Sequence, residues 1–276
     1  MEPQSSGGTT SEARWETART DDGVVVVARF HNPPLNYMTG AGLTRFGELV
    51  EEWADPEVRA IVIAGGEPGV FITHFSVEEL LGSLGPMAER GPELNYRVHA
   101  ISTALNDLPK PVICALNGDT MGFGFELALS ADIRIGQRGD HRYGLPEVRL
   151  GLIPGGTGTQ RLSRAIGPAA ALDLLLRGRV LDPEAALERG LIHELAEDAL
   201  ATAERLAATL AGYPRTALAA AKRIVYQAAD LPLASALRME ADAAFRAKVS
   251  PEAAAAMERY LAVPPAERRA WLEEGA

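Results

Sequence analysis

The segment from Lys110 to Ile135, KPVICALNGDTMGFGFELALSADIRI, places the strongest constraint on how this chain can fold. It begins with an apolar run, Pro111 to Leu116, of the kind that forms a buried strand. An Asn-Gly pair interrupts the run, and a Gly-Phe-Gly sequence follows before the apolar residues FELALSAD. We therefore interpret the segment as a buried strand, a glycine-containing turn and a short apolar helix.

The predicted helix carries one acid, Glu126, close to its start. Glycine allows the backbone to come close to another group, and a helix N-terminus offers free N–H groups and the positive end of the dipole. The segment therefore predicts a preformed site for an anion or oxyanion with a carboxyl group beside it. A turn with a purely structural role is the alternative.

A second segment, residues 143–162, has the sequence YGLPEVRLGLIPGGTGTQRL. Within it, Glu147 follows a proline, precedes an apolar stretch that resembles a strand, and lies just before the turn Pro154-Gly155-Gly156. The segment supplies a second candidate carboxyl group next to a glycine-rich turn.

The rest of the chain predicts alternating strands and helices followed by a helical end. Strands are expected at Trp15–Thr20, Val24–Phe30 and Ala60–Ala64, and Thr39 is a candidate cap for a helix that extends to about Ala54. A further helix is expected at residues 90–108. From about Asp198 the sequence is rich in Ala and Leu and predicts four or five helices.

The two segments, in this order and spacing, resemble the enoyl-CoA hydratase/isomerase family, also called the crotonase family. The pieces that carry the resemblance are KPVICALNG, GFGFELALSADIRI and PEVRLGLIPGGTGTQRL, within a similarity that runs from about Gly23 to about Tyr260. The resemblance implies an α/β fold with a spiral of repeated β-β-α units over residues 14–200. A C-terminal helical region that drives oligomerisation would cover residues 201–276. The composition of residues 1–13 predicts a flexible tail.

The resemblance also implies a reaction and the groups that perform it. Glu126 and Glu147 match the two catalytic glutamates of the family, and the backbone N–H groups of Phe75 and Phe123 match the two oxyanion donors. The implied reaction is the reversible syn hydration of a 2-enoyl-CoA thioester, in which coenzyme A is part of the substrate and no separate cofactor takes part.

Further residues are placed by the same resemblance. Those expected near the substrate pocket are His74, Gly122, Gly155 and Tyr260. Those expected near the coenzyme A moiety are Asn36 and Thr73. The resemblance implies a homotrimer or a dimer of trimers.

The chain departs from the family pattern at two places near the expected site. Where the family has a sequence like FxAGAD, this chain has FITHFS, so His74 replaces a glycine, and Phe123 replaces another. His74 is either a functional side chain or a packed polar residue. These departures, and the lack of basic residues just after Tyr260, leave two alternatives open. One is an isomerase or a β-dicarbonyl or acyl-CoA hydrolase on the same scaffold, and the other is a noncatalytic acyl-CoA-binding protein.

Composition limits the classes of partner expected for this chain and indicates its cellular location. The chain has 276 residues, a net charge of −10 and no basic cluster, which argues against a nucleic-acid partner. No histidine stands at metal-ligand spacing, so no metal is expected. No apolar run is long enough to span a membrane, and no secretory signal is recognisable. The single cysteine, Cys114, lies in the predicted buried strand, which favours a structural thiol and a cytoplasmic setting.

Overall fold

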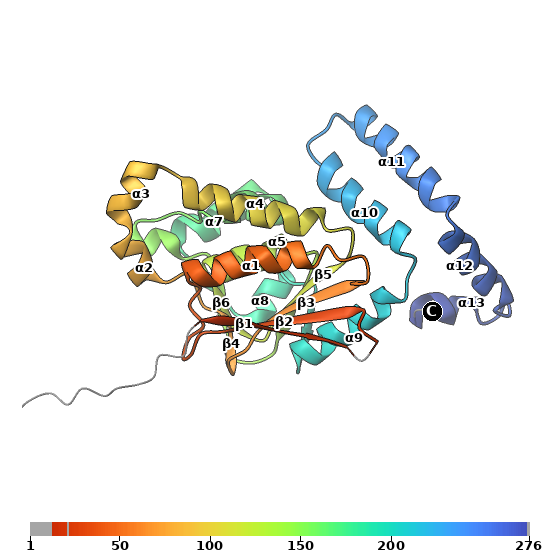
Figure 1. Cartoon of the computed structure of the whole chain (residues 1–276), viewed down its shortest axis with the longest axis horizontal. Coiled ribbons are helices and arrows are strands. Elements are labelled where there is room, and N and C mark those ends of the chain that lie inside the picture. Colours follow the sequence, from red (N-terminus) through yellow and green to blue (C-terminus); the bar gives the residue numbers. More distant parts are fainter. Residues whose placement is uncertain (1–12, 21, 275–276) are drawn as a thin grey trace, which may run out of the picture.

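A computed structural model describes residues 13–20 and 22–274, so the predicted tail at residues 1–13 lies almost entirely outside the described residues. A six-stranded sheet forms the centre (Figure 1). Its strands, in spatial order, are β1 (Arg14–Arg19), β2 (Val25–His31), β3 (Ala60–Gly65), β5 (Val112–Leu116), β7 (Ile133–Gln137) and β10 (Glu194–Ala196). The pairing of β1 with β2 is antiparallel and the other pairings are parallel.

A second sheet of four strands is built from the same stretches of chain. Its strands, in spatial order, are β4 (Gly69–Ile72), β6 (Gly118–Met121), β8 (Tyr143–Gly144) and β9 (Val180–Leu181). The consecutive pairs β3–β4, β5–β6 and β7–β8 each contribute one strand to each sheet, and helical segments follow each pair. This repetition confirms the predicted spiral of β-β-α units.

Helices cover both faces of the six-stranded sheet. Side chains of a strand alternate between the two faces, and every residue of β3 and β5 is buried, so both faces are apolar. The helices between the strands are α1 (Gly40–Glu52), α2 (Val77–Gly82), α3 (Leu84–Arg90), α4 (Glu93–Asp107), α5 (Phe123–Ser130), α6 (Gly158–Ile166), α7 (Pro168–Arg177) and α8 (Pro183–Glu188). In Figure 1, α1 and α4 lie on one face of the sheet and the later helix α9 (Ala199–Ala211) lies on the other. As predicted, Thr39 caps α1 by accepting a hydrogen bond from the N–H of Gly42.

Two local predictions were wrong. The residues after Asn117 were expected to form only a turn, but Gly118–Met121 form β6, which pairs with β4 and β8. The stretch that follows Glu147 was expected to be strand-like, but Glu147–Leu150 form a 3-10 helix, η1. Both differences arise from contacts with distant parts of the chain.

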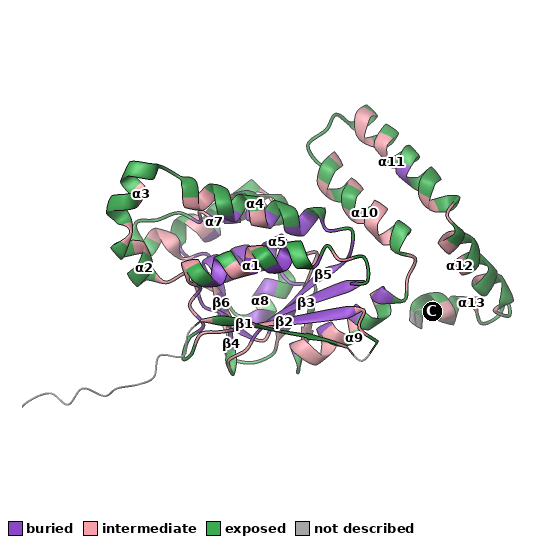
Figure 2. Cartoon of the chain, viewed as in Figure 1, coloured by how far each residue is buried: buried purple, intermediate pink, exposed green. Residues whose placement is uncertain are grey.

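The C-terminal helices extend to one side of the sheets. They are α10 (Arg215–Ala228), α11 (Leu233–Lys248), α12 (Pro251–Ala262) and α13 (Arg268–Glu274). Together with α9 they make five helices among the described residues, within the predicted four or five. The predicted boundary at residue 200 falls at the start of α9, whose buried alanines pack on the sheet. The helices beyond α9 are mostly exposed (Figure 2). No helix within the described residues is long and apolar enough to cross a membrane.

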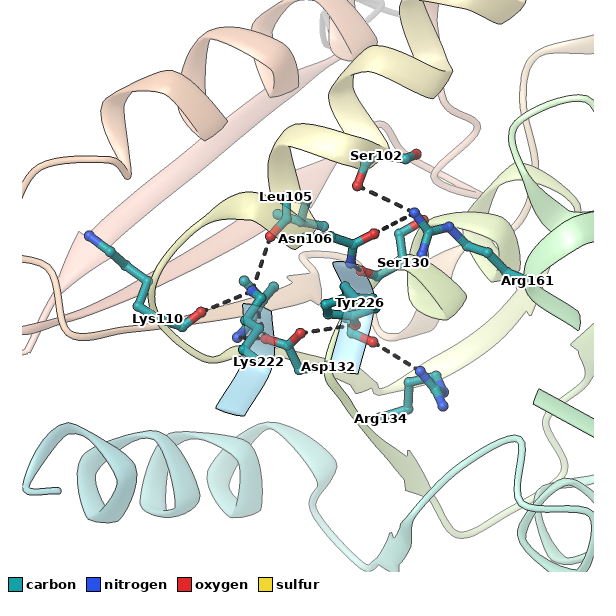
Figure 3. Close-up of polar contacts among 12 residues, drawn as sticks. Ser102, Leu105, Asn106, Lys110, Ser130, Asp132, Arg134, Arg161, Lys222 and Tyr226 are labelled. Atoms are coloured by element: carbon teal, nitrogen blue, oxygen red, sulfur yellow. Dashed lines mark hydrogen bonds and ion pairs between the residues drawn. The ribbon is translucent and has the colours of Figure 1, made fainter. Parts of the chain in front are cut away.

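A buried polar cluster attaches α10 to the sheet core (Figure 3). The ammonium group of Lys222 lies 2.9 Å from a carboxylate oxygen of Asp132 and also donates to the carbonyls of Leu105 and Lys110. The hydroxyl of Tyr226 donates to the other carboxylate oxygen of Asp132 at 3.0 Å. The side chains of Lys222 and Asp132 are only 9% and 17% exposed, so the pair is largely shielded from water.

Replacing Lys222 with Met should lower the free energy of unfolding by about 3 kcal/mol, because Asp132 would keep its buried charge without a cation. This is the lower end of the range for a broken buried pair, since Asp132 would still accept from Tyr226 and from the N–H of Val112. Urea unfolding followed by circular dichroism measures the change. Lys248→Met, at an exposed position, should stay within about 0.5 kcal/mol of wild type. Equal stability of the two variants would contradict the prediction.

Candidate active site

The segment that organises the sequence delivers a helix N-terminus to the centre of the molecule. Gly122, the residue before α5, has φ 49° and ψ −129°, a conformation that favours glycine. At Gly124, a Cβ atom would lie 1.9 Å from the carbonyl oxygen of Ile72, so only glycine lets α5 approach β4 this closely. The start of α5, with Glu126 in its first turns, is thereby pressed against the end of β4.

The carboxyl group of Glu126 is buried and held by backbone donors. Its Oε1 atom accepts hydrogen bonds from the N–H groups of Gly156, at 2.8 Å, and Gly158, at 2.7 Å. Burial raises the pKa of Glu126 to about 7, although both hydrogen bonds favour the ionised form. The group is therefore set to exchange a proton near neutral pH.

Glu147 lies at the start of η1 and approaches the same place from another element. Burial, and to a smaller extent the negative charge of Glu126, raise the pKa of Glu147 to about 7. Its buried Oε2 atom accepts no hydrogen bond from the described residues. Its Oε1 atom would lie 3.5 Å from a Cβ atom placed on Gly122.

The structure thus places the Glu147 carboxyl beside Gly122 and close enough to Glu126 for the charge of Glu126 to act on it. The negative charge of Glu126 raises the pKa of Glu147, so ionisation of Glu126 favours the protonated form of Glu147. Such a pair can take a proton from one atom of a substrate or water and give a proton to another.

His74 lines the same place. Its Cβ atom would lie 3.1 Å from a Cβ atom on Gly122, so the His74 backbone is next to the turn before α5. The imidazole ring stacks on Tyr37, with ring centroids 4.4 Å apart, and its Nδ1 lies 2.7 Å from the carbonyl oxygen of Phe75. The ring is therefore held by Tyr37 and by the carbonyl of Phe75.

Phe75 and Phe123, the two predicted backbone donors, are neighbours. Their rings pack edge to face with centroids 6.1 Å apart. Hydrogen bonds from Met38 to His74 and from Ser76 to Met38 flank Phe75. Within the described residues, the N–H groups of Phe75 and Phe123 have no backbone or side-chain acceptor, so both are available to a bound molecule.

The other predicted site residues have mainly architectural contacts. Asn36 is fully buried, and its amide donates to the carbonyls of Phe30 and Phe71. Thr73 donates to the carbonyl of Leu35. Both residues shape the loop between β2 and α1, and their contact with coenzyme A stays a prediction.

Gly155 and Tyr260 differ in their distance from the glutamates. The carbonyl of Gly155 accepts from Asn95 and His99 on α4, one residue before the turn that binds Glu126. Tyr260 lies on α12, packs on Trp271 and has the guanidinium of Arg268 above its ring. Figure 1 places α12 at the end of the molecule opposite α2 and α3, and a place for Tyr260 in the substrate pocket stays a prediction.

Sequence reasoning missed the donors that hold Glu126. The residues are Gly156 and Gly158, and a Cβ atom on either would lie 2.7 Å from an oxygen of the Glu126 carboxyl. The available signal was the density of glycines in PGGTGT, which indicates a close approach of backbone to another group. It does not say which group is approached.

Comparisons with known proteins identify the family to which this chain belongs. The sequence profile described as enoyl-CoA hydratase/isomerase matches residues 19–263. A Bacillus subtilis (strain 168) protein named "Probable enoyl-CoA hydratase" is 34% identical over 229 residues, which cover 80% of this chain and 85% of the relative. The Danio rerio peroxisomal bifunctional enzyme is 37% identical over 186 residues, which cover 67% of this chain. This chain spans only 24% of that longer protein.

Solved structures agree with the sequence comparisons. The enoyl-CoA hydratase from Thermoplasma volcanium GSS1 superposes with a TM-score of 0.81 at 28% identity, over 89% of this chain and 96% of that one. The enoyl-CoA hydratase from Mycobacterium smegmatis superposes with a TM-score of 0.82 at 26% identity, over 90% and 95% of the two chains.

Replacing Glu126 with Gln should lower the pKa of Glu147 below about 7, because the negative charge that disfavours its ionisation is removed. Burial remains, so the pKa should stay above the ordinary range for glutamate. An infrared titration of the protonated carboxyl band, assigned by its absence from Glu147→Gln, measures the shift. Glu188→Gln, at an exposed position on α8, is the matched control and should leave the titration unchanged. An unchanged or higher pKa of Glu147 in Glu126→Gln would contradict the coupling.

Proposed function

Because the chain belongs to the enoyl-CoA hydratase/isomerase family, we propose that it catalyses the reversible syn hydration of a 2-enoyl-CoA thioester. The observation that carries the proposal is the pair of carboxyl groups of Glu126, which is buried, and Glu147, which is half-buried, each with a pKa raised to about 7. Adding water to a conjugated double bond requires one group that accepts a proton and one that donates a proton, and this pair supplies both.

The surroundings of the two carboxyl groups favour different roles in hydration. Glu126 accepts two backbone N–H bonds, which favour its ionised form, so it is the base that takes a proton from the attacking water. Glu147 has a buried oxygen without a donor and faces the charge of Glu126, so its neutral form is favoured. In this proposal Glu147 delivers the proton to the α-carbon, and the roles reverse in dehydration.

Backbone donors would stabilise the charge that develops on the thioester oxygen. The N–H groups of Phe75 and Phe123 have no protein acceptor among the described residues, and the two residues are neighbours in space. The removal of one such donor typically costs about 2.7–4 kcal/mol of transition-state stabilisation. The N-terminus of α5 adds the positive end of its dipole at Phe123.

The acyl group would lie against the rings of Phe75 and Phe123 and beside the stacked pair of His74 and Tyr37. Coenzyme A enters as part of the substrate, with Asn36 and Thr73 in the loop proposed to face it. The proposed chemistry uses no metal and no redox cofactor. A cytoplasmic location is proposed from the buried thiol of Cys114, whose pKa burial raises to about 12.

The C-terminal helices support a proposal of self-association into a trimer or a dimer of trimers. Large apolar side chains on them face outward, among them Leu233, Phe245 and Val249, which are 73%, 65% and 61% exposed. Apolar surface of this kind is typical of a region that packs on another protein. The proposed occupant is a second copy of the same chain.

Wild-type protein should hydrate crotonyl-CoA, measured as loss of the absorbance of the conjugated thioester. Glu147→Gln and Glu126→Gln should each lower kcat at least about a hundredfold, since each removes one proton-transfer group. Glu188→Gln is the matched control for the change of charge and should keep wild-type turnover, because Glu188 is exposed on α8. Circular dichroism and light scattering would show that the variants keep the fold and mass of wild type.

An inactive wild type that still binds coenzyme A esters would refute short-chain hydration. The departure of His74 and Phe123 from the family pattern favours the second candidate, a hydrolase or isomerase on the same scaffold. Product analysis with one 3-oxoacyl-CoA and one enoyl-CoA would distinguish them. Binding without turnover of any thioester would instead favour a noncatalytic acyl-CoA-binding protein.

Light scattering should give a mass three or six times the 29.4 kDa of one chain. Phe245→Glu should shift the distribution towards smaller species, because a charge would be buried in the interface. A monomeric wild type would contradict the proposed assembly. Glu240→Gln, at an exposed position on the same helix, is the control for a change of surface charge.

A further inference from the structure

The turn that binds Glu126 contains a residue in a conformation that its side chain disfavours. Thr157, between Gly156 and Gly158, has φ 96° and ψ −7°. A positive φ is rare for a β-branched residue and persists only where surrounding contacts impose it. This conformation directs the N–H groups on both sides of Thr157 to the same oxygen of Glu126.

The contact that restrains Thr157 comes from Arg161, one turn further along α6. Its Nε donates to the Thr157 hydroxyl at 2.9 Å, and its Nη2 donates to the side-chain oxygen of Asn106 at 2.5 Å and to the carbonyl of Ser102 at 3.4 Å (Figure 3). The Thr157 hydroxyl makes no capping bond to α6. Arg161 therefore ties the turn to α4 as well as to its own helix.

The guanidinium of Arg161 is an unusual group to place here. Its acceptors within the described residues are neutral oxygens, and burial lowers its pKa. The charged and titratable groups that act on it are Tyr226, Arg164 and Asp132. A half-buried cation held only by neutral oxygens gains little stabilisation from charge pairing. Its main effect is to orient the groups that accept from it, because its planar N–H donors have fixed directions.

The same network reaches the backbone of Glu126. Asn106 accepts from Arg161 and donates from its amide to the carbonyl of Ser130 at 2.7 Å. The hydroxyl of Ser130 donates to the carbonyl of Glu126 at 3.0 Å. The carboxyl group of Glu126, through the turn, and its main chain, through α5, are thus fixed by one connected set of bonds.

We propose that Arg161 is a positioning residue that holds the Gly156-Thr157-Gly158 turn in place and thereby fixes the carboxyl group of Glu126 for proton transfer. The inference rests on the proposed role of Glu126 as a base and identifies a residue on which that role depends. Arg161 acts through the two N–H donors rather than through its charge. In agreement, the groups that shift the pKa of Glu126 are its burial and these two donors, without a contribution from Arg161.

Arg161→Met should lower kcat for crotonyl-CoA about ten- to a hundredfold, because a small displacement of a reacting group away from the chemistry has effects of this size. KM should change less than about twofold, since Arg161 touches no part of the proposed substrate site. The pKa of Glu126 should rise above about 7, because the two N–H bonds that favour its ionised form are weakened. The pH–rate limb that reports the base should shift to higher pH.

Arg164→Met is the matched control, because Arg164 lies on the same helix and is exposed. It should keep the kcat, the pKa of Glu126 and the pH–rate profile of wild type. Thr157→Val removes only the hydroxyl that Arg161 binds and should shift all three quantities in the direction of Arg161→Met. This second variant decides the question if Arg161→Met does not fold.

A rescue variant separates positioning from general stability. In Arg161→Met/Thr157→Gly, glycine adopts the positive φ without strain, so the turn needs less restraint. This double variant should recover part of the kcat that Arg161→Met loses. Equal kcat and pKa in wild type, Arg161→Met and Thr157→Val would overturn the proposal, as would equal losses in Arg164→Met.

The infrared titration of Glu126, assigned by the band missing in Glu126→Gln, does not require activity. If wild type fails to hydrate crotonyl-CoA, the proposed function fails, and the pKa of Glu126 in Arg161→Met still tests the positioning role. A pKa that stays at the wild-type value would then overturn it.

Discussion

The arrangement of this molecule depends on a carboxyl group, that of Glu126, which is buried and yet accepts two hydrogen bonds that favour its ionised form. Burial alone would keep Glu126 neutral, because a charge in a poorly solvated place is costly. Two backbone N–H groups at 2.8 and 2.7 Å oppose that cost. These opposing effects leave the pKa of Glu126 at about 7. They require a turn, the start of a helix and the edge of a sheet to meet at one point.

Glycines at that point let backbone segments meet more closely than side chains would allow. Gly124 brings α5 against the carbonyl of Ile72, and Gly158 leaves room for the Glu126 carboxyl. The position between the two donors is occupied by Thr157 instead, whose conformation must be imposed by neighbours. The glycines of the site therefore keep their backbone conformation without help, whereas Thr157 depends on contacts with Arg161 and, through it, with α4.

Local patterns predicted much of the framework. The run VVVVARF gave β2, Thr39 gave the cap of α1, and Glu126 and Glu147 were identified as the candidate pair from the segments that contain them. The strand β6 was missed because GDTM has little intrinsic strand preference and is held by pairing with β4 and β8. The 3-10 helix at Glu147 and the bonds to Gly156 and Gly158 depend on how distant segments meet, which no local pattern encodes.

The attachment of α10 to Asp132 has a consequence for how the chain can be divided. Asp132 lies between α5 and β7, and its carboxylate is satisfied partly by Lys222 and Tyr226, which lie about ninety residues further along the chain. A chain that ended before α10 would leave this carboxylate without its cation and without the hydroxyl of Tyr226. The helix α10 is therefore bonded to the sheet core, and a chimaera that exchanged the C-terminal helices for those of a relative would have to supply a matching ammonium and hydroxyl.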